Sequence, residues 1–387
     1  MRVLLAFDKF KDALSAREAC RVAAAALQSQ HPSWELDLCP LTDGGDGFVE
    51  ILTASAGGRL QIASVEGPRG EGVAAEFGLV DFAAMPPLAQ RLLTGGKTYG
   101  AEAKVALVEM AGASGLALLP HAQRDPWQTS SFGTGELLRA AAPLADLIVL
   151  GIGGSATNDL GLGALAALGL KFLSANTGVV SRPVPAHWKE IAKIDGSVSA
   201  GFPPLFVACD VSNPLLGPTG CAAVYGPQKG LRPADLPALE RESARLADLL
   251  CDHCGRPRSL QTTPGAGAAG GIAFGLMAAA NARLVPGSTL TAAWLNLDDR
   301  IQRADIVITG EGRFDASSAQ GKGPGAVVQL AHAAGKRTHV FAGQIAADST
   351  AARLHAISPA DWPRERAIQA TAELLQLALE REFLRAP

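Results

Sequence analysis

The first fifty residues constrain the fold most strongly, because they follow a strand–helix–strand pattern. An apolar run over residues 2–7 is typical of a buried strand. Ser15 and Glu18 form a capping box that predicts the start of a helix, and residues 36–41 predict the next strand. This order is a βαβ unit, which implies a parallel sheet with a right-handed crossover. Ligands of such sheets bind beyond the carboxyl ends of the strands.

The rest of the chain predicts a second, inserted domain. Further strands are expected at 60–65, 73–80, 104–110, 147–152 and 205–208, and the strand–helix rhythm returns after Pro286 with strands at 305–309 and 338–342 and a final helix at 370–384. The two chain ends resemble each other more than either resembles the middle. We therefore predict one α/β domain built from residues 1–55 and 285–387, and another from 56–284.

Composition excludes several classes of protein. The 387 residues are 48% hydrophobic, and 34 basic side chains face 37 acidic ones, so a disordered chain and a nucleic-acid-binding protein are both disfavoured. No stretch approaches the roughly 20 apolar residues of a membrane span. Asp8 and Lys9 come too early for a signal peptide, and the six cysteines fit reduced thiols, so we expect a cytoplasmic protein. Cys251 and Cys254 lack the second ligand pair of a zinc site.

Acidic side chains follow several of the predicted strands. The first two strands are followed by Asp8 with Lys11 and by Asp43 with Asp46. The alternative to a ligand site is that these residues lie in solvent-exposed turns. Residues 310–315 place two carboxylates and a guanidinium at another strand end, a combination suited to an anion together with a divalent metal. We expect these residues, with those around Asp210, to line a polar cleft between the domains.

Two glycine-rich segments carry different expectations. Residues 151–159 join a strand to a helix, where small residues and a helix N-terminus favour an anion, so phosphate or substrate binding is predicted there. Residues 265–270 match G-x-G-x-x-G, but no strand precedes them and no acid follows about 20 residues on. Close helix packing explains that match better than dinucleotide binding.

Taken in order, these motifs resemble those of the type I glycerate kinase family. The matching segments are 8–15, 43–47, 109–115, 130–136, 153–159, 209–214, 226–230, 264–271 and 309–315. The sequence departs from the family pattern at Lys9, Asp46 and Leu160, where Ser, Glu and Gly are usual. Residues 317–320 also replace the Gln-Thr-containing turn that is more typical before Gly321.

The resemblance implies a kinase that uses ATP and Mg²⁺ to phosphorylate D-glycerate at the 2-hydroxyl, with a glycerate 3-kinase as an open alternative. It also implies a flavodoxin-like parallel sheet built from both chain ends, an inserted α/β domain with a mixed sheet, and an active-site cleft between them. The partners are then small molecules, without nucleic acid or membrane, and a homo-oligomer stays open. A kinase of a related hydroxyacid, a nicotinamide-dependent hydroxyacid dehydrogenase and a non-catalytic bilobed metabolite sensor remain alternatives.

Phosphoryl transfer requires positioning, charge neutralisation and a base near the attacking hydroxyl, which suggests hypothetical roles for the charged residues. Asp43 would be the general base and Arg313 would hold the glycerate carboxylate. The other assignments are Lys11 and Lys322 for neutralising the transferred phosphate, Gly153, Gly154 and Ser155 for cradling phosphate, Asp210 and Asp315 for Mg²⁺, and Asp8, Asp46, Asn158 and Glu311 for further substrate or nucleotide contacts.

Overall fold

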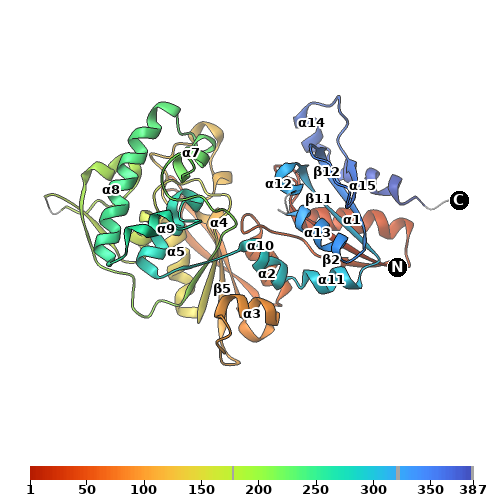
Figure 1. Ribbon diagram of the computed structural model, residues 1–387, viewed down its shortest axis with the longest axis horizontal. Coiled ribbons are helices and arrows are strands. Elements are labelled where there is room, and N and C mark those ends of the chain that lie inside the picture. Colours follow the sequence, from red (N-terminus) through yellow and green to blue (C-terminus); the bar gives the residue numbers. More distant parts are fainter. Residues whose placement is uncertain (177, 320–322, 385–387) are drawn as a thin grey trace. The chain divides into compact units, whose positions relative to one another are not determined.

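The structure is a computed structural model that describes residues 1–176, 178–319 and 323–384. Its internal contacts divide the chain into two compact units (Figure 1): unit 1 is 1–43 with 291–387, and unit 2 is 44–290. Helix α2 (Phe48–Ser55) packs on strands of unit 2 and therefore belongs to that unit. The first boundary between the units accordingly lies before α2, after residue 43. The domain limits expected from sequence, after 55 and before 285, stay a prediction.

Unit 1 is built on a five-stranded parallel sheet. Its strand order is β13-β12-β11-β1-β2, which is the 2-1-3-4-5 order of flavodoxin-like folds when the strands are counted along the unit. The fold class implied by the resemblance is thereby confirmed for this unit. The strands are β1 (Arg2–Phe7), β2 (Glu35–Leu38), β11 (Ile306–Phe314), β12 (Arg337–Ile345) and β13 (Arg353–Ala356).

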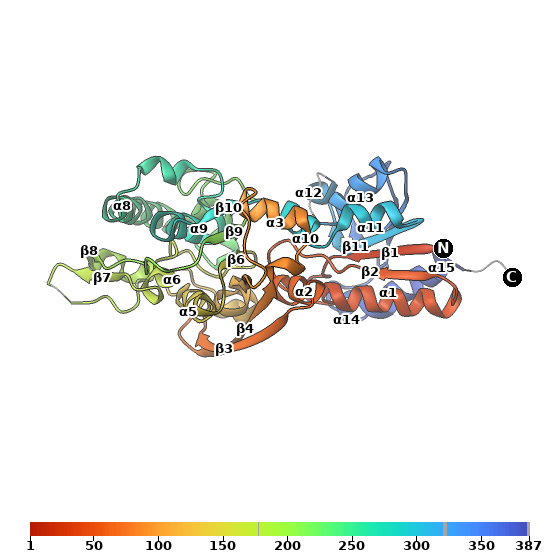
Figure 2. The same cartoon turned by 90° about the horizontal axis from the view of Figure 1, so that it is seen from below.

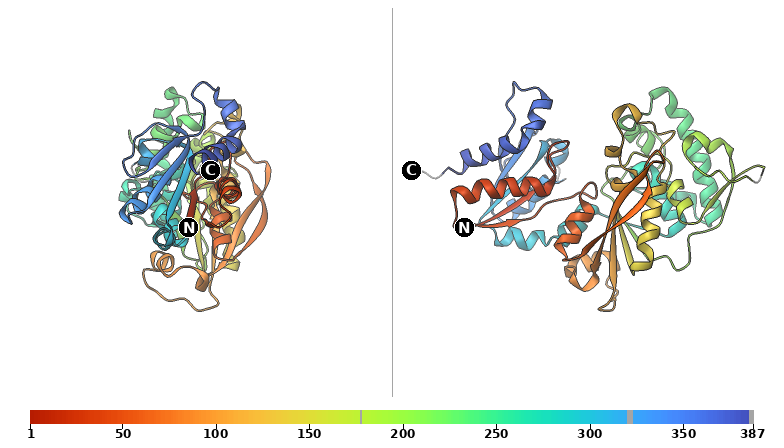
Figure 3. Two further views of the ribbon diagram at one scale, coloured as in Figure 1. Left: turned by 90° about the vertical axis from the view of Figure 1, so that its right-hand side faces the viewer. Right: turned by 180° about the vertical axis from the view of Figure 1, so that it is seen from behind.

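Helices cover both faces of this sheet (Figure 2). Helices α1 and α15 pack together on one face, over a core that includes Leu5, Ile308 and Phe341, and α11 and α13 lie over the other. The views in Figure 3 show α1 in red running beside the blue C-terminal helix. The helices are α1 (Ala16–Gln30), α11 (Leu297–Arg303), α12 (Ala316–Ala319), α13 (Pro324–Ala333), α14 (Arg364–Gln369) and α15 (Thr371–Glu382).

The capping box predicted for α1 is present. The Ser15 hydroxyl accepts a hydrogen bond from the Glu18 N–H at 3.2 Å, and the Glu18 carboxylate accepts one from the Ser15 N–H at 2.8 Å. These two bonds satisfy N–H groups that a helix start leaves without intrahelical partners.

Unit 2 contains a mixed six-stranded sheet of order β10-β9-β6-β5-β4-β3 and a separate hairpin, β7-β8. Strands β10, β9, β6 and β5 are parallel, and β4 and β3 continue the sheet in antiparallel fashion. The strands are β3 (Arg59–Glu66), β4 (Gly72–Asp81), β5 (Lys104–Glu109), β6 (Leu147–Gly151), β7 (Lys171–Ser174), β8 (Ile191–Asp195), β9 (Leu205–Ala208) and β10 (Arg283–Val285).

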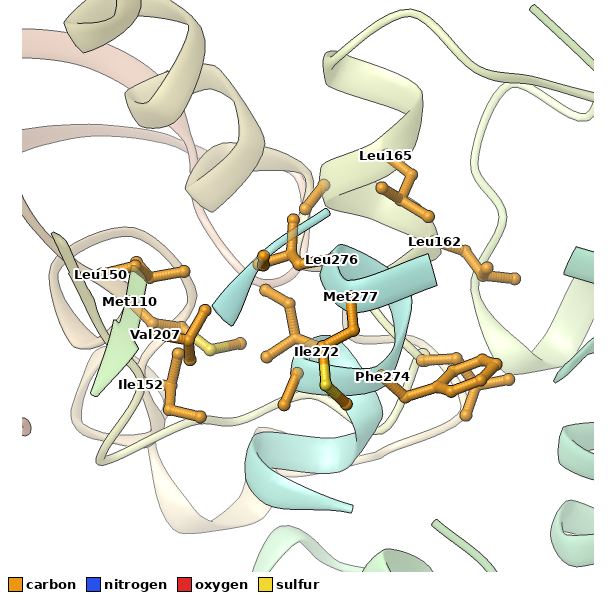
Figure 4. Close-up of a cluster of buried hydrophobic side chains, with 14 of the residues drawn as sticks. Met110, Leu150, Ile152, Leu162, Leu165, Val207, Ile272, Phe274, Leu276 and Met277 are labelled. Atoms are coloured by element: carbon orange, nitrogen blue, oxygen red, sulfur yellow. The ribbon is translucent and has the colours of Figure 1, made fainter. Parts of the chain in front are cut away.

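The main core of unit 2 lies on one face of this sheet. Figure 4 shows Ile272 and Leu276 between Leu150 and Val207 of the strands and Leu165 of a neighbouring helix. Burial of this apolar surface supplies the main drive for folding the unit. The helices, besides α2, are α3 (Pro87–Thr94), α4 (Met110–Ser114), α5 (Phe132–Ala141), α6 (Leu162–Ala167), α7 (Cys221–Tyr225), α8 (Leu236–Cys254), α9 (Ala268–Ala280) and α10 (Gly287–Trp294), the last of which contains the point where the chain returns to unit 1.

One strand differs from its prediction in a way that matters for the site. The strand expected at 305–309 continues to Phe314, because Glu311 and Arg313 keep their parallel pairing with Ala342 and Gln344 of β12. The acidic segment is therefore partly a strand rather than a turn after it. Among the described residues, no helix has the length and apolar character needed to cross a membrane.

Candidate active site

Unit 1 gathers four carboxylates at the carboxyl end of its sheet. Asp8 directly follows β1, and its backbone N–H donates to Gly310 of β11 at 2.9 Å. Glu311, next along β11, lies close enough to Asp8, Asp315 and Asp43 for all three to act on its charge. The sequence-predicted residues Asp8, Asp43, Glu311 and Asp315 are thus brought together, and we call them the acidic group.

Glu311 is the most perturbed member of this acidic group. Burial, together with the negative charges of Asp8, Asp315 and Asp43, raises the pKa of its carboxyl to about 7, against an opposing hydrogen bond from Ser318. Its Oε1 atom is buried and has no hydrogen-bond partner among the described residues. Repulsion between partly buried carboxylates this close together destabilises the folded chain. Strongly perturbed groups of this kind are typical of functional sites.

Cationic side chains accompany these acids. Lys9 Nζ lies 3.7 Å from an Asp43 carboxylate oxygen, and Arg313 Nε lies 4.0 Å from Asp315. Lys11 is exposed, and its backbone lies beside Gly312. The lysine at position 322 falls outside the described residues, so its assignment stays a prediction from sequence.

Unit 2 presents a loop of small residues at the carboxyl end of β6. The Gly153 N–H donates to Gly44 at 2.9 Å, and a Cβ on Gly153 would come within 2.6 Å of Gly45, so only glycine fits. Gly154 is exposed with φ +72°, and a Cβ there would lie 3.3 Å from an Asp46 carboxylate oxygen. Asp46 and the Gly153–Gly154 turn therefore lie side by side.

The helix after this loop has a carboxylate of the chain itself at its N-terminus, and the binding of a phosphate or substrate by residues 151–159 stays a prediction. Asp159 is completely buried and accepts hydrogen bonds from the N–H groups of Gly161, at 3.1 Å, and Gly163, at 3.2 Å. It also accepts from the N–H and hydroxyl of Ser131, at 2.8 and 2.7 Å. The Asp159 carboxylate thus lies at the start of α6, and Ser131 helps to hold it there.

Lys229, from the segment 226–230, is a buried cation in contact with this loop, and the sequence analysis assigned it no individual role. Its ammonium group donates to the Ser155 hydroxyl at 2.9 Å and to the Thr157 carbonyl at 2.6 Å, and its side chain is 2% exposed. Burial lowers its pKa to about 8, while the nearby Cys221 and Asp159 act in the opposite direction. The signal in the sequence was a lysine in the polar segment 226–230, but nothing there predicted its burial.

The glycines at 265–270 serve close packing, as the sequence predicted. A Cβ on Gly270 would come within 2.0 Å of the Thr157 carbonyl oxygen, and one on Gly267 within 2.2 Å of the Pro214 carbonyl oxygen. Gly270 and Gly271 also have positive φ angles, at +73° and +89°. The absence of side chains at these glycines allows the start of α9 to pack directly on the loop that carries Asn158.

The remaining predicted residues have contrasting surroundings. Asn158 is fully buried, and neither polar atom of its amide has a hydrogen-bond partner among the described residues. Asp210, just past β9, is exposed, and its two oxygens accept hydrogen bonds from the N–H and hydroxyl of Ser288, at 2.8 and 3.0 Å. Asp210 therefore caps the start of α10, which accounts for its position without a metal.

Comparisons with known proteins agree with this arrangement. The model of the glycerate kinase family matches residues 3–383. The chain belongs to the glycerate kinase family. A glycerate kinase of Bacillus subtilis (strain 168) is 36% identical over 97% of this chain and 95% of its own length, and a glycerate 2-kinase of Escherichia coli (strain K12) is 35% identical over 92% and 89%.

A solved structure supports the same assignment. A crystal structure from Salmonella typhimurium LT2, whose provisional name is glycerate kinase 2, matches with a TM-score of 0.76 and 32% identity over 99% of this chain and 97% of that one. This glycerate kinase family member is accordingly a kinase, and its two-unit α/β fold is the one found in that structure.

The raised pKa of Glu311 predicts a pH-dependent stability. A carboxyl that is protonated more readily when folded than when unfolded stabilises the protein below its unfolded pKa, and this contribution is lost as the pH rises to about 7. We expect Glu311→Gln to match the wild type near pH 4.5 and to be more stable by about 1–3 kcal/mol near pH 8, without divalent cations. Chemical denaturation across this range measures it, with exposed Glu365→Gln as control; parallel curves for wild type and Glu311→Gln would contradict it.

The lowered pKa of Lys229 predicts the opposite slope at alkaline pH. Because the folded chain gives up this proton more readily than the unfolded chain, the wild type should gain stability relative to Lys229→Met between pH 8 and 10.5. The gain should be about 1–3 kcal/mol. Denaturant melts over this window test it, and Lys171→Met, which removes an exposed lysine of unit 2, is the matched control. A constant difference between wild type and Lys229→Met would show that the buried ammonium does not titrate in the folded state.

Proposed function

We propose that this chain transfers the γ-phosphoryl group of ATP to the 2-hydroxyl of D-glycerate, giving 2-phosphoglycerate and ADP. The observation that carries the proposal is the acidic group around Glu311, on a chain whose Escherichia coli relative is a glycerate 2-kinase. A kinase of a small hydroxyacid needs a carboxylate base and bound cations near the acceptor hydroxyl. Unit 1 has both kinds of group at one sheet edge.

In this proposal, Asp43 is the general base. It is exposed, close to Lys9, and on the same sheet edge as the rest of the acidic group. Its carboxylate accepts the proton of the 2-hydroxyl while the bond from that oxygen to the γ-phosphorus forms. The bond from this phosphorus to the bridging oxygen breaks, and ADP leaves with its electron pair.

The cations of unit 1 bind the negative charge of the reactants. Arg313 is exposed, and its planar guanidinium can bind the glycerate carboxylate through two parallel hydrogen bonds. Lys11 is assigned to the transferred phosphate, as is Lys322 on its sequence position alone. In unit 2, Gly153, Gly154 and Ser155 are assigned to phosphate, with Lys229 fixing the Ser155 hydroxyl as a positioning residue.

The residues of unit 1 fit a divalent cation of the Mg²⁺ type. Oxygen ligands are what Mg²⁺ prefers, and Glu311 Oε1 is a buried carboxylate oxygen without a partner among the described residues. Asp8, Asp315 and Glu311 would hold the ion, and a bound Mg²⁺ would neutralise phosphate oxygens. The earlier assignment of Asp210 to Mg²⁺ is weaker, because both of its oxygens are already hydrogen-bonded to Ser288.

A coupled assay with ATP, Mg²⁺ and D-glycerate tests the activity, and phosphorus NMR of the product tests the position. We expect ADP release that depends on D-glycerate, and 2-phosphoglycerate as the product. Reactions without glycerate and with L-glycerate serve as controls. Formation of 3-phosphoglycerate would contradict the 2-hydroxyl assignment while leaving the kinase activity in place.

The role of Asp43 predicts a specific kinetic effect. Asp43→Asn keeps the size of the side chain but removes the base, so kcat should fall by about 10²–10⁴-fold with little change in KM for D-glycerate. Asp12→Asn is the matched control, because Asp12 is 57% exposed against 56% for Asp43 and pairs with a surface arginine of unit 1. An unchanged kcat for Asp43→Asn would remove Asp43 as the base.

A further inference from the structure

A second cluster of titratable side chains lies in unit 1, away from the acidic group. His339 is on β12, His355 is on β13 and Glu382 ends α15. In the strand pairing, His339 stands opposite Arg353 and Phe341 opposite His355, so the two histidines are diagonal neighbours on one face of the sheet. This face is the one covered by α1 and α15 (Figure 2).

Three ligand-type atoms of this cluster converge. His339 Nδ1 lies 3.1 Å from His355 Nε2 and 3.5 Å from a Glu382 carboxylate oxygen, and one ligand atom from each residue lies within 4.8 Å of the others. A four-coordinate zinc ion with bonds of about 2.0–2.2 Å holds its ligand atoms roughly 3.3–3.6 Å apart. The two distances from His339 Nδ1 are therefore close to those of a zinc site, and the third pair of ligand atoms would need to approach within this range.

The histidines are suited to bind a metal rather than to balance the glutamate charge. His339 is 2% exposed, and burial, with a further contribution from His355, lowers its pKa to about 4. Burial also lowers the pKa of His355. Both rings are neutral near pH 7, and a neutral imidazole offers a lone pair to a metal but no positive charge to a carboxylate.

Packing holds the rings in place. The His339 ring centroid lies 5.0 Å from that of Phe383, and His355 stacks on Phe341 with centroids 4.4 Å apart. The other ring nitrogen of His339, Nε2, is buried with no hydrogen-bond partner among the described residues. A histidine buried at this cost, with its Nδ1 aimed at two further ligand atoms, indicates a role beyond filling the core.

Arg353 forms an ion pair with Glu382 in this cluster. Its guanidinium lies 3.3 Å from the Glu382 carboxylate, but the side chain is 73% exposed. Arg337 is the other nearby cation that acts on His339. Exposed ion pairs are weak, so a metal ion can replace Arg353 as the partner of Glu382 at small cost.

We propose that His339, His355 and Glu382 bind one Zn²⁺ ion, with water as the fourth ligand. Imidazole nitrogens with a carboxylate oxygen suit this metal. His339 precedes Ala342, the partner of Glu311 in the sheet, by three residues, which is roughly 10 Å of strand. The ion joins β12, β13 and the C-terminal helix, so its role is structural and separate from phosphoryl transfer.

Zinc titration of the full-length chain without a histidine tag tests this proposal. The protein is stripped with a chelator, and binding of Zn²⁺ alone is measured by equilibrium dialysis with metal analysis. We expect one equivalent for the wild type and affinity at least 100-fold weaker for His355→Ala and Glu382→Gln, since even loss of an outer-shell partner costs 10–100-fold. Co²⁺ in place of Zn²⁺ should give the visible absorption of a tetrahedral site in the wild type and not in these variants.

Matched controls identify where the ion binds. His332→Ala removes an exposed histidine of the same unit, and Cys254→Ser removes a thiol of the C-x-x-C segment; both should keep one equivalent. Circular dichroism without metal checks that His355→Ala and Glu382→Gln are folded, and both should retain the kinase activity. The proposal is overturned if the wild type binds no Zn²⁺, if both cluster variants bind it as tightly as the wild type, or if Cys254→Ser removes the binding.

Discussion

Crowding of negative charge at one sheet edge is the constraint on which the function of unit 1 depends. Glu311 is partly buried beside three other carboxylates, and the wild-type chain accepts the resulting electrostatic cost. Strongly perturbed carboxyl groups of this kind are concentrated at functional sites, where a bound cation can offset the repulsion. Parallel pairing of β1 with β11 fixes the arrangement, because it brings Asp8 next to Gly310 and thereby next to Glu311.

In unit 2, buried charged side chains hold the loop of small residues after β6 in one conformation. Asp159 and Lys229 are both buried, and each is hydrogen-bonded within unit 2 to the loop or to residues beside it. The carboxylate binds the first N–H groups of α6, and the ammonium binds the Ser155 hydroxyl and a loop carbonyl. Buried charged side chains therefore support the exposed Gly154 turn, and fixed geometry of this kind is what the proposed phosphate contact would require.

The sequence predicted the fold far better than it predicted these supports. Buried parallel strands such as 205–208 are continuous apolar runs with clear ends, and the Ser15/Glu18 box marks a helix start through local hydrogen bonds, so both could be identified without tertiary information. The continuation of β11 to Phe314 could not, because it depends on pairing with β12 rather than on the local residues. Lys229 and the histidine cluster were missed for the same reason: burial of a single polar side chain is decided by elements distant in sequence.

The two clusters of titratable side chains in unit 1, around Glu311 and around Glu382, differ in the chemistry of their neighbours. At Glu311, every neighbouring ionisable group that raises the pKa is another acid, and the unpartnered oxygen lies at the sheet edge where ligands bind in this fold. At Glu382, the neighbours are two histidines and an arginine, and the cluster lies on a helix-covered face, well before that edge. Hard oxygen donors alone favour Mg²⁺ and phosphate, whereas mixed nitrogen and oxygen donors favour zinc. If both proposals hold, unit 1 binds two different cations without competition, because the chemistry of each donor set selects a different one.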